Sequence, residues 1–241
     1  MVGDHEYIYP YIKDQHTAFA WAMSYGTHLD HMRPLIQSEW YAVKWIRRYP
    51  EDRYVMYPFI KSEDQFLTYA KQYPDDIGVI SRYITQGWSL FQLGLLAVKN
   101  TPVLHGIADI IQQEEFLMEL LEHDSSLADR LRHRIRTSVN ALRWALKYPE
   151  DRAIMIDHIT ESSHAYQWTV KYPEDRALMR DRVTESQWAY YWALKYPEDR
   201  DLMIDRVIES DVAFSWINNI GNVEVMYRRI TDPQLAFLLS T

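Results

Sequence analysis

A 24-residue period organises this chain. The segment Tyr148-Pro149-Glu150-Asp151-Arg152 recurs 24 residues later from Tyr172 and again from Tyr196, and an earlier copy begins at Tyr49. The 24 residues that begin at Tyr148 share 15 identities with the 24 that begin at Tyr172. A fixed period of this length is typical of repeat architectures, in which each repeat is one supersecondary unit. The repeat therefore constrains the fold more than any local motif does.

Large side chains mark the same place in most repeats, and we expect them to form the core. They are spaced by 24 residues in two groups: Trp21, Trp45 and Tyr69, then Trp144, Trp168, Trp192 and Trp216. Leu96 and Leu120 fill the equivalent places between the groups, which puts three extra residues between Tyr69 and Leu96. Counted in this way, about ten units cover nearly the whole chain.

Each unit has the pattern of two short helices. The first carries an apolar stripe at the i, i+3, i+4, i+7 spacing, represented by Ala189, Trp192, Ala193 and Tyr196. We expect Ser186 or Thr184 to cap it. The helix should end before Pro197, because proline disfavours a helical residue ahead of it, and Pro197 suits the first position of a second helix. That second helix has its own stripe: Leu202, Met203 and Val207.

Helices of roughly ten residues are shorter than the ~12–15 at which an isolated helix becomes marginal in water. No unit can fold alone, and stacked units bury their stripes in one continuous core. The sequence therefore predicts an all-α fold, an α-helical solenoid of about ten 24-residue two-helix repeats, curved or superhelical. We expect one repeat array over 1–241: regular repeats over about 12–82, divergent repeats over about 83–139, regular repeats over about 140–219 and a C-terminal capping repeat over about 220–241.

The unit resembles a known class of repeat. Its pattern Asp-Arg-x-x-Met-x-x-x-Ile/Val-x-x-Ser-x-x-Ala-Tyr-x-Trp is similar to the helix-pair repeats of an uncharacterised domain-of-unknown-function class, found in arrays in microbial and viral proteins. Asp151-Arg152 and the segment from Ala165 to Trp168 match its two motifs. The resemblance implies the helical-pair fold and, because viral arrays of this type exist, a virus-encoded inhibitor or modulator of a host protein. It transfers no functional residue.

Composition limits the function classes. The chain has no Cys, which excludes disulfide scaffolds, thiolate nucleophiles, zinc ribbons and iron–sulfur clusters. Thirty-four acidic against 26 basic residues give a net charge of −8, which on average repels nucleic acid and anionic membranes. No run of about 18 apolar residues occurs. We expect a cytoplasmic protein, in the host cytoplasm if viral, without a membrane segment and without a cofactor.

The recurrent Glu-Asp-Arg triplets predict structure rather than catalysis, because a catalytic group is needed once and a structural group in every unit. We expect caps and inter-repeat ion-pair ladders from the triplets together with Asp157, Asp181 and Asp205 and with Lys147, Lys171 and Lys195. A second candidate is the pair His28 and His31, whose spacing could place two metal ligands on one helical face. No sequence motif of a known enzyme class accompanies them.

The divergent central repeats hold the strongest local charge. An acidic cluster, Glu114, Glu115, Glu119 and Glu122, precedes a basic run, Arg130, Arg132, His133, Arg134 and Arg136. One interpretation is a partner site or a self-association surface, and the other is drift of old repeats. Under the first, the four arginines contact a partner or a second copy of the chain.

Three function hypotheses follow from the sequence. The first is a non-enzymatic protein–protein interaction repeat protein whose partner is another protein, with self-association as a further prospect. The second is a nucleic-acid-related role, either as an acidic DNA mimic or through phosphate binding by the run 130–136, although the acidic balance argues against direct nucleic-acid binding. The third is an enzyme or small-ligand binder that uses the region of His28 and His31.

Overall fold

The structure, a computed structural model, describes residues 7–239 of the 241-residue chain. Within that range the regular secondary structure is helical, without a strand. The helices group into two compact units, Met1–Asp129 and Arg130–Thr241, which we call unit 1 and unit 2. In both units consecutive helices pack against their neighbours along the chain, and the fold is therefore all-α.

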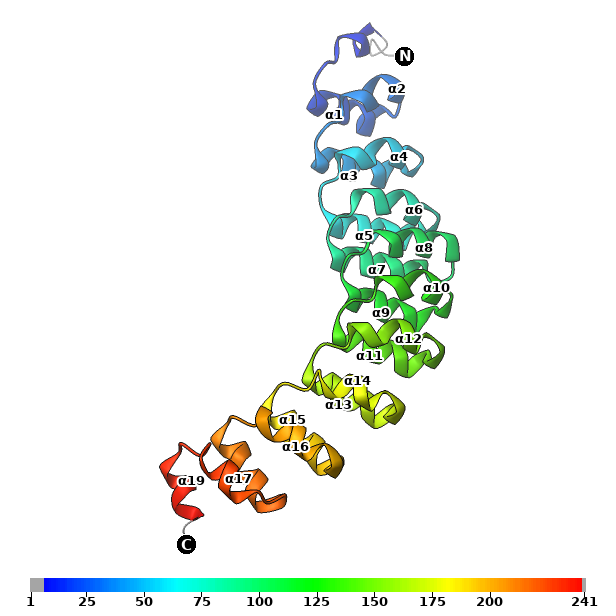
Figure 1. The fold of residues 1–241 in the computed structure, drawn as a ribbon. Helices are drawn as coiled ribbons and strands as arrows, with labels where there is room; N and C mark the ends of the chain where they lie inside the picture. The colour runs from blue at the N-terminus through cyan, green and yellow to red at the C-terminus, as the bar shows by residue number, and fades with distance from the viewer. Residues whose placement is uncertain (1–6, 240–241) are drawn as a thin grey trace. The chain divides into compact units, whose positions relative to one another are not determined.

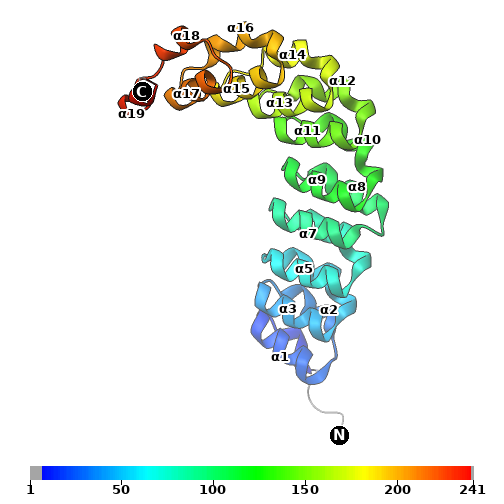
Figure 2. The same cartoon turned by 90° about the horizontal axis from the view of Figure 1, so that it is seen from below.

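Unit 1 alternates longer helices with shorter ones (Figure 1). The longer helices, which we call first helices, are α1 (Gln15–Tyr25), α3 (Glu39–Arg48), α5 (Glu63–Gln72), α7 (Gly87–Ala97) and α9 (Glu114–His123). The segments between them are η2 (Tyr9–Tyr11) before α1, then α2 (Leu29–Met32), η3 (Arg33–Leu35), η4 (Pro50–Asp52), α4 (Arg53–Met56), η5 (Tyr57–Phe59), η6 (Pro74–Asp76), α6 (Ile77–Ile80), η7 (Ser81–Tyr83), α8 (Thr101–Ile110) and η8 (Ser125–Leu127). Figure 2 shows α3, α5, α7 and α9 in one row.

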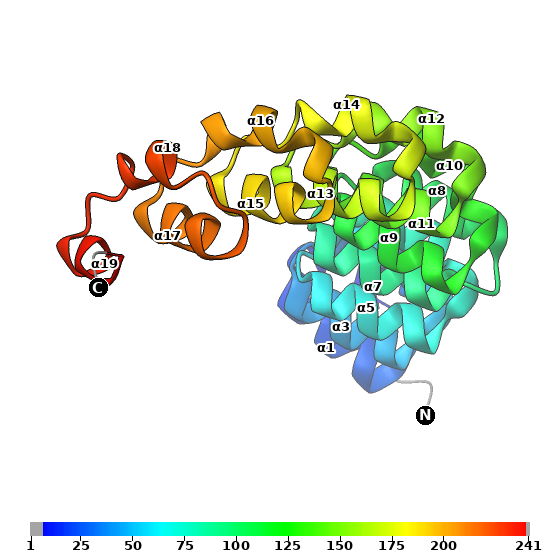
Figure 3. The ribbon, with the colours of Figure 1, turned by 60° about the horizontal axis from the view of Figure 1, so that its bottom comes forward.

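Unit 2 repeats the alternation, and Figure 3 shows its first helices in one row beneath the shorter helices. Helix α10 (Ala128–Leu131) spans the border between the units. The first helices are α11 (Ser138–Lys147), α13 (Ser162–Lys171), α15 (Ser186–Lys195) and α17 (Ser210–Asn219). The remaining segments are η9 (Arg132–Arg134), η10 (Pro149–Asp151), α12 (Arg152–Met155), η11 (Ile156–His158), η12 (Pro173–Asp175), α14 (Arg176–Arg180), η13 (Pro197–Asp199), α16 (Arg200–Met203), η14 (Ile204–Arg206), α18 (Val223–Tyr227) and α19 (Pro233–Leu238).

The second helix of a regular unit is a composite rather than one continuous helix. After Tyr196, which has φ −124° and ψ 82°, Pro197 opens the 3-10 turn η13. Asp199 follows with φ −96° and ψ 3°, near the bridge region where 3-10 and turn residues lie. The four-residue helix α16 and the 3-10 turn η14 complete the segment. Proline fixes φ and lacks an amide N–H, which suits the first turn of such a segment.

The core contains the large side chains that mark the repeats. Five indoles, Trp45, Trp144, Trp168, Trp192 and Trp216, have no solvent exposure, and Trp21 and Tyr69 are also buried. Two further buried ladders run beside them. One lies at the end of each short helix: Met32, Met56, Ile80, Ile107, Leu131, Met155, Met179, Met203 and Met226. The other lies in the linker before each first helix: Ile12, Ile36, Ile60, Ile84, Ile111, Ile135, Ile159, Val183 and Val207.

The three extra residues lie later than the marker spacing predicts. Leu96, expected in the core, is 37% exposed, whereas Leu93 is fully buried at the seventh position of α7. Tyr69 and Trp144 hold the seventh position of their own helices. The insertion therefore falls between Leu93 and Leu120, where a longer α7 leads into α8, which is a continuous ten-residue helix. Placing the insertion before Leu96 was wrong.

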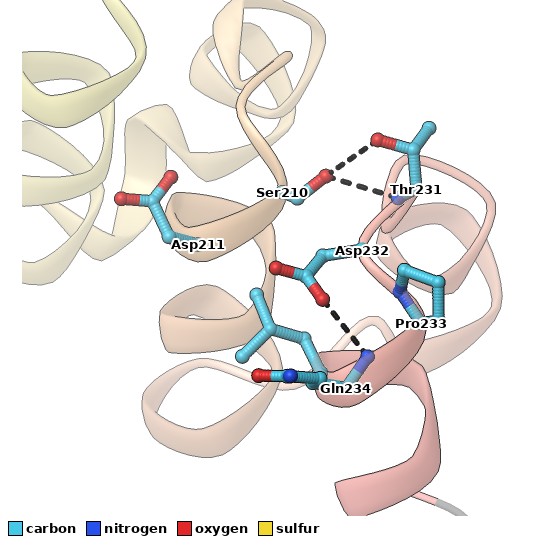
Figure 4. A pocket seen from close by; sticks show the side chains of 7 residues that line it. Ser210, Asp211, Thr231, Asp232, Pro233 and Gln234 are labelled. Atoms are coloured by element: carbon cyan, nitrogen blue, oxygen red, sulfur yellow. Dashed lines mark hydrogen bonds between the residues drawn. The ribbon is translucent and has the colours of Figure 1, made fainter.

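In most units the first residue of the first helix ties its unit to the next linker. Glu185 occupies the N-cap of α15 without a side-chain cap, so neither Ser186 nor Thr184 is the cap that the sequence suggested. Instead Ser186 Oγ accepts a hydrogen bond from the amide of Ile208, at 3.0 Å. Ser162 and Ser210 make the same bond to Thr184 and Thr231, both at 2.9 Å. We call this bond from a linker amide to a serine Oγ the serine clasp. Figure 4 shows it for Ser210, beside Asp232, which caps α19.

Candidate partner-binding surface

The first helices of unit 1 carry an apolar surface on the side opposite the core. At 100° per residue, the second, fifth, sixth and ninth residues of a first helix point away from the fourth and seventh, which are buried. We call the surface formed by these positions on α3, α5 and α7 the outer face of unit 1. Its members are Trp40, Val43, Lys44, Arg47, Asp64, Leu67, Thr68, Lys71, Trp88, Phe91, Gln92 and Leu95. Leu67 and Phe91 are buried among their neighbours and form the floor of this face rather than its exposed part.

Two indoles are exposed on this outer face. Trp40 is 57% exposed and Trp88 is 55% exposed, whereas the core indoles of the repeats have little or no exposure. Trp88 packs beside Phe91, with ring centroids 5.4 Å apart, and Lys44 Nζ lies 3.7 Å from the centroid of Trp40. Aromatic side chains are enriched where one protein binds another.

Two hollows lie along the same surface. The first has a volume of 360 Å³ and the second 260 Å³. The residues that line the first are Glu39, Trp40, Val43, Lys44, Arg47 and Gln65. The residues that line the second are Leu67, Lys71, Trp88, Phe91, Gln92, Leu95 and Leu96. The hollows therefore combine exposed aromatic rings with long cationic side chains.

The charge of the outer face opposes that of the chain. Three cations, Lys44, Arg47 and Lys71, stand on it with one carboxylate, Asp64. Glu39, which lines the first hollow, accepts hydrogen bonds through Oε1 from the amides of Lys61 and Ser62, at 3.2 and 2.8 Å. The whole chain has a net charge of −8, so the excess of cations over α3 and α5 is local to this face.

Unit 2 has an apolar stripe at the same helix positions. The ninth residues of three successive first helices, Leu146, Val170 and Leu194, are 47%, 49% and 39% exposed. Beside them Tyr191 is 40% exposed, and its ring centroid lies 6.4 Å from that of Tyr166. The regular repeats therefore present large apolar side chains to solvent at 24-residue intervals.

The Glu-Asp-Arg triplets make hydrogen bonds and ion pairs within and between neighbouring repeats. The aspartate of the triplet accepts a hydrogen bond from the indole Nε1 of its own unit, as Asp199 does from Trp192 at 2.9 Å. An arginine of the preceding unit reaches the same carboxylate, since Arg176 Nε lies 3.4 Å from Asp199 Oδ2. Arg176 also contacts Glu198. Each buried carboxylate thereby receives a hydrogen bond and an opposite charge, which its burial requires.

Where a tyrosine replaces the core indole, the carboxylate finds other donors. Tyr69 stands where other units have tryptophan, and Asp76 is fully buried. Tyr57 Oη donates to Asp76 Oδ2 at 2.7 Å, and Arg53 and Tyr54 also donate to this carboxylate. Burial raises the pKa of Asp76, but these hydrogen bonds outweigh it and hold the pKa below the ordinary value of 3.8. Asp76 is therefore an ionised structural group.

The predicted aspartate ladder exists, and its partners are arginines. Asp157 and Asp181 lie 3.7 and 3.6 Å from the guanidinium groups of Arg182 and Arg206. Each arginine also donates to carbonyl groups of the preceding unit, as Arg206 Nη1 does to Val183 O at 2.6 Å. Lys195, which the sequence suggested for the ladder, lies with Nζ 5.9 Å from the ring centroid of Tyr196.

The basic run of the sequence analysis falls partly on structural positions. Arg132 Nη1 lies 3.2 Å from Asp151 Oδ1, and Arg180, 48 residues later, approaches Asp199 in the same way at 3.7 Å. Arg136 donates to Ile135 O at 2.9 Å. Arg134 holds the register of Arg182 and Arg206. Two more members, Arg130 and His133, are exposed.

The acidic cluster lies on α9 of unit 1. Glu115 and Glu119 are exposed, and Glu114, the first residue of the helix, is half-buried. Glu114 holds the helix position at which Glu39 and Glu63 bind linker amides. The structure therefore places Glu115 and Glu119 on the solvent side of α9.

The two histidines do not share a helix face. His28 has a left-handed φ of 54° and precedes α2, and its ring stacks on Tyr9 with centroids 3.7 Å apart. His31 Nε2 lies 3.3 Å from Ile12 O. Over residues 7–239 no group of three or more His, Asp or Glu side chains is arranged to hold a metal ion. A 740 Å³ hollow lies beside Ser210 and Asp232 (Figure 4).

Sequence reasoning missed the outer face because it assigned all of the repeated tryptophans and tyrosines to the core. Trp40 and Trp88 stand five residues before the core positions Trp45 and Leu93. Five residues correspond to 500°, which places them about 140° away from the core direction. That offset between two sets of aromatic residues was the available signal.

Among the described helices, none has the length and apolar character to span a bilayer. Comparison of the chain with protein-family models, with curated proteins and with solved structures found no match.

Proposed function

We propose that this protein is a non-enzymatic α-helical solenoid of about ten two-helix repeats that binds another protein through the outer faces of its first helices. The observation that carries the proposal is the exposure of Trp40 and Trp88 beside two apolar hollows. Tryptophan is enriched at the energetic centre of protein interfaces.

The repeat construction supports the same proposal. The residues that recur most strictly, the indoles and the aspartates of the triplets, are buried and bonded to each other. The second, sixth and ninth positions of the first helices face away from this bonded core. Exposed apolar side chains lie at these positions in both units, among them Trp40, Trp88, Leu146, Val170 and Tyr191. A stacked array with such a surface suits an extended interface.

Site-specific photo-crosslinking tests the proposal. A photoreactive phenylalanine analogue replaces Trp40, Trp88 or Val170 on first helices, and Val55 or Ile110 on the short helices as matched exposed apolar controls. We expect one protein, at one-to-one stoichiometry, to be crosslinked from the first-helix positions and not from the controls. Equal adducts from both sets, or none from the first helices, would contradict the proposal.

A further inference from the structure

We infer that the outer face of unit 1 binds an acidic peptide segment that carries two large apolar side chains. The inference rests on the proposed function and names the chemistry of its partner. It concerns one surface, the outer face over α3, α5 and α7, with its two hollows and three cations.

The two hollows specify two apolar anchors. The 360 Å³ hollow lies where α3 meets Gln65 of α5, and the 260 Å³ hollow lies between α5 and α7. They are thus displaced by one first helix, and packed helices lie about 8–10 Å apart. An α-helix separates residues i and i+7 by about 10.5 Å, and an extended strand separates residues i and i+3 by about 10 Å. A short peptide can therefore fill both hollows.

The cations specify the charge of the peptide. Lys44 and Arg47 line the first hollow and Lys71 lines the second, so each apolar anchor site has a positive neighbour. Glu39, the carboxylate of the first hollow, already receives two backbone hydrogen bonds. An acidic segment therefore gains favourable charge contacts with Lys44, Arg47 and Lys71. Its acidic residues should lie over α3 and α5, because α9 carries Glu115, Glu119 and Glu122 at the same helix positions.

The spacing of the indoles favours a peptide over single-stranded nucleic acid. Trp40 and Trp88 are two first helices apart, which corresponds to roughly 16–20 Å. Single-strand binding surfaces stack successive bases on aromatic rings, and they follow the phosphates with continuous positive charge. Asp64 holds the intermediate helix position, between Trp40 and Trp88 in the repeat register. The row formed by Trp40, Asp64 and Trp88 therefore has neither closely spaced aromatic rings nor continuous positive charge.

A display selection tests the inference with defined probes. Random 16-residue peptides are selected on the full-length chain, and enriched peptides are synthesised and titrated. The comparison protein carries Lys44→Glu, Arg47→Glu and Lys71→Glu, and the matched control carries Lys13→Glu, Lys61→Glu and Lys99→Glu, three exposed lysines outside this face. Both triple variants change the net charge equally, and thermal unfolding verifies that both fold.

We expect enriched peptides to be acidic, with two large apolar residues at a constant spacing. Their affinity should fall at least tenfold for the face variant and stay within twofold for the control. No enrichment, enrichment of neutral or basic peptides, or equal affinity for the face variant would overturn the inference, as would tighter binding of a dT20 oligonucleotide to this face. If photo-crosslinks from Trp40 or Val170 persist in any of those cases, the proposed function stands and only the peptide chemistry is wrong.

Discussion

The indole Nε1 of Trp144 donates a hydrogen bond of 2.8 Å to Oδ2 of Asp151, seven residues later in the same unit. The bond recurs in three further units, with Asp52, Asp175 and Asp199 as acceptors. It joins the first helix to the 3-10 turn that opens the second. In the unit formed by α9 and η8 both members of the pair are replaced by buried leucines, Leu120 and Leu127. Where only one member is kept, the remaining group either finds other partners, as Asp76 does, or stays unpaired, as the Trp216 N–H does.

Removal of the carboxylate should be costly. Asp151→Ala leaves the buried Trp144 N–H without its acceptor and removes the ion pair with the partly exposed Arg132. We expect a loss of about 2–3 kcal/mol in the free energy of unfolding, mostly from the unsatisfied indole N–H, because solvent screens the ion pair. Asp157→Ala, which removes an exposed ladder carboxylate, should cost about 0.5 kcal/mol or less. Urea unfolding followed by circular dichroism measures both, and equal losses would contradict this role.

Trp216, the last of the repeated indoles, allows the opposite change, in which a carboxylate acceptor is added. Trp216 Nε1 is buried without a hydrogen-bond partner, and Val223 stands seven residues later where other units have aspartate. Grafting the consensus turn, by Ile220→Tyr, Gly221→Pro, Asn222→Glu, Val223→Asp and Glu224→Arg, replaces the left-handed backbone of Gly221 and Asn222 with the Tyr-Pro turn of the other units. In that turn the carboxylate introduced at position 223 should supply the acceptor and lie near Arg200. We expect a gain of about 1–2 kcal/mol in the free energy of unfolding.

A control separates this effect from general consensus stabilisation. The same graft in a Trp216→Phe background lacks the indole donor and should gain clearly less stability. If both backgrounds gain equally, the unpaired indole is not the cause.

Acid should weaken unit 1 through Asp76. Because its hydrogen bonds hold the folded-state pKa below the unfolded value of 3.8, Asp76 contributes stability above about pH 4. That contribution is lost as the pH falls below 4 and through the folded-state pKa. We expect Asp76→Asn to be less stable than the wild type at pH 7 and to lose less stability between pH 5 and pH 3. Parallel pH profiles for the two proteins would count against this prediction.

Buried and exposed indoles should differ in what they stabilise. Trp168→Ala empties a fully buried site and should cost about 3–5 kcal/mol of unfolding free energy. Trp88→Ala, at a site 55% exposed, should cost less than about 1 kcal/mol. The matched exposed control is Trp40→Ala. Thermal unfolding checks all three, and a large loss for Trp88→Ala would place that indole in the core.

The sequence predicted the helices well because the repeat samples the same local pattern many times. It predicted that the first helix ends before Pro197, and α15 ends at Lys195. It missed the division of the second helix into η13, α16 and η14, because apolar spacing over ten residues does not distinguish an α-helix from short 3-10 and α segments. It also missed the serine clasp, since a bond across 22 residues leaves no local signal.

The misplaced insertion had a readable signal in another ladder. Ile60 and Ile84 are 24 residues apart, and Ile84 and Ile111 are 27 apart, so the extra residues must follow Ile84. The aromatic markers concealed this because leucine replaces them in the central repeats. For the candidate site, local charge drew attention to the run 130–136, where Arg132 serves the buried Asp151. The outer face carries fewer charges, and it is recognised only once the solvent exposure of Trp40 and Trp88 is known.

Titration of the crosslinked partner against three proteins tests the central claim most directly. The three are the full-length chain, the double variant Trp40→Ala/Trp88→Ala and the double control Val55→Ala/Ile110→Ala. If the outer face of unit 1 is the binding surface, the dissociation constant should rise at least about 30-fold for the tryptophan variant, equivalent to 2 kcal/mol at an interface hot spot. The control should stay within about twofold of the wild type. An unchanged dissociation constant for Trp40→Ala/Trp88→Ala, with an unchanged melting temperature, would contradict the account.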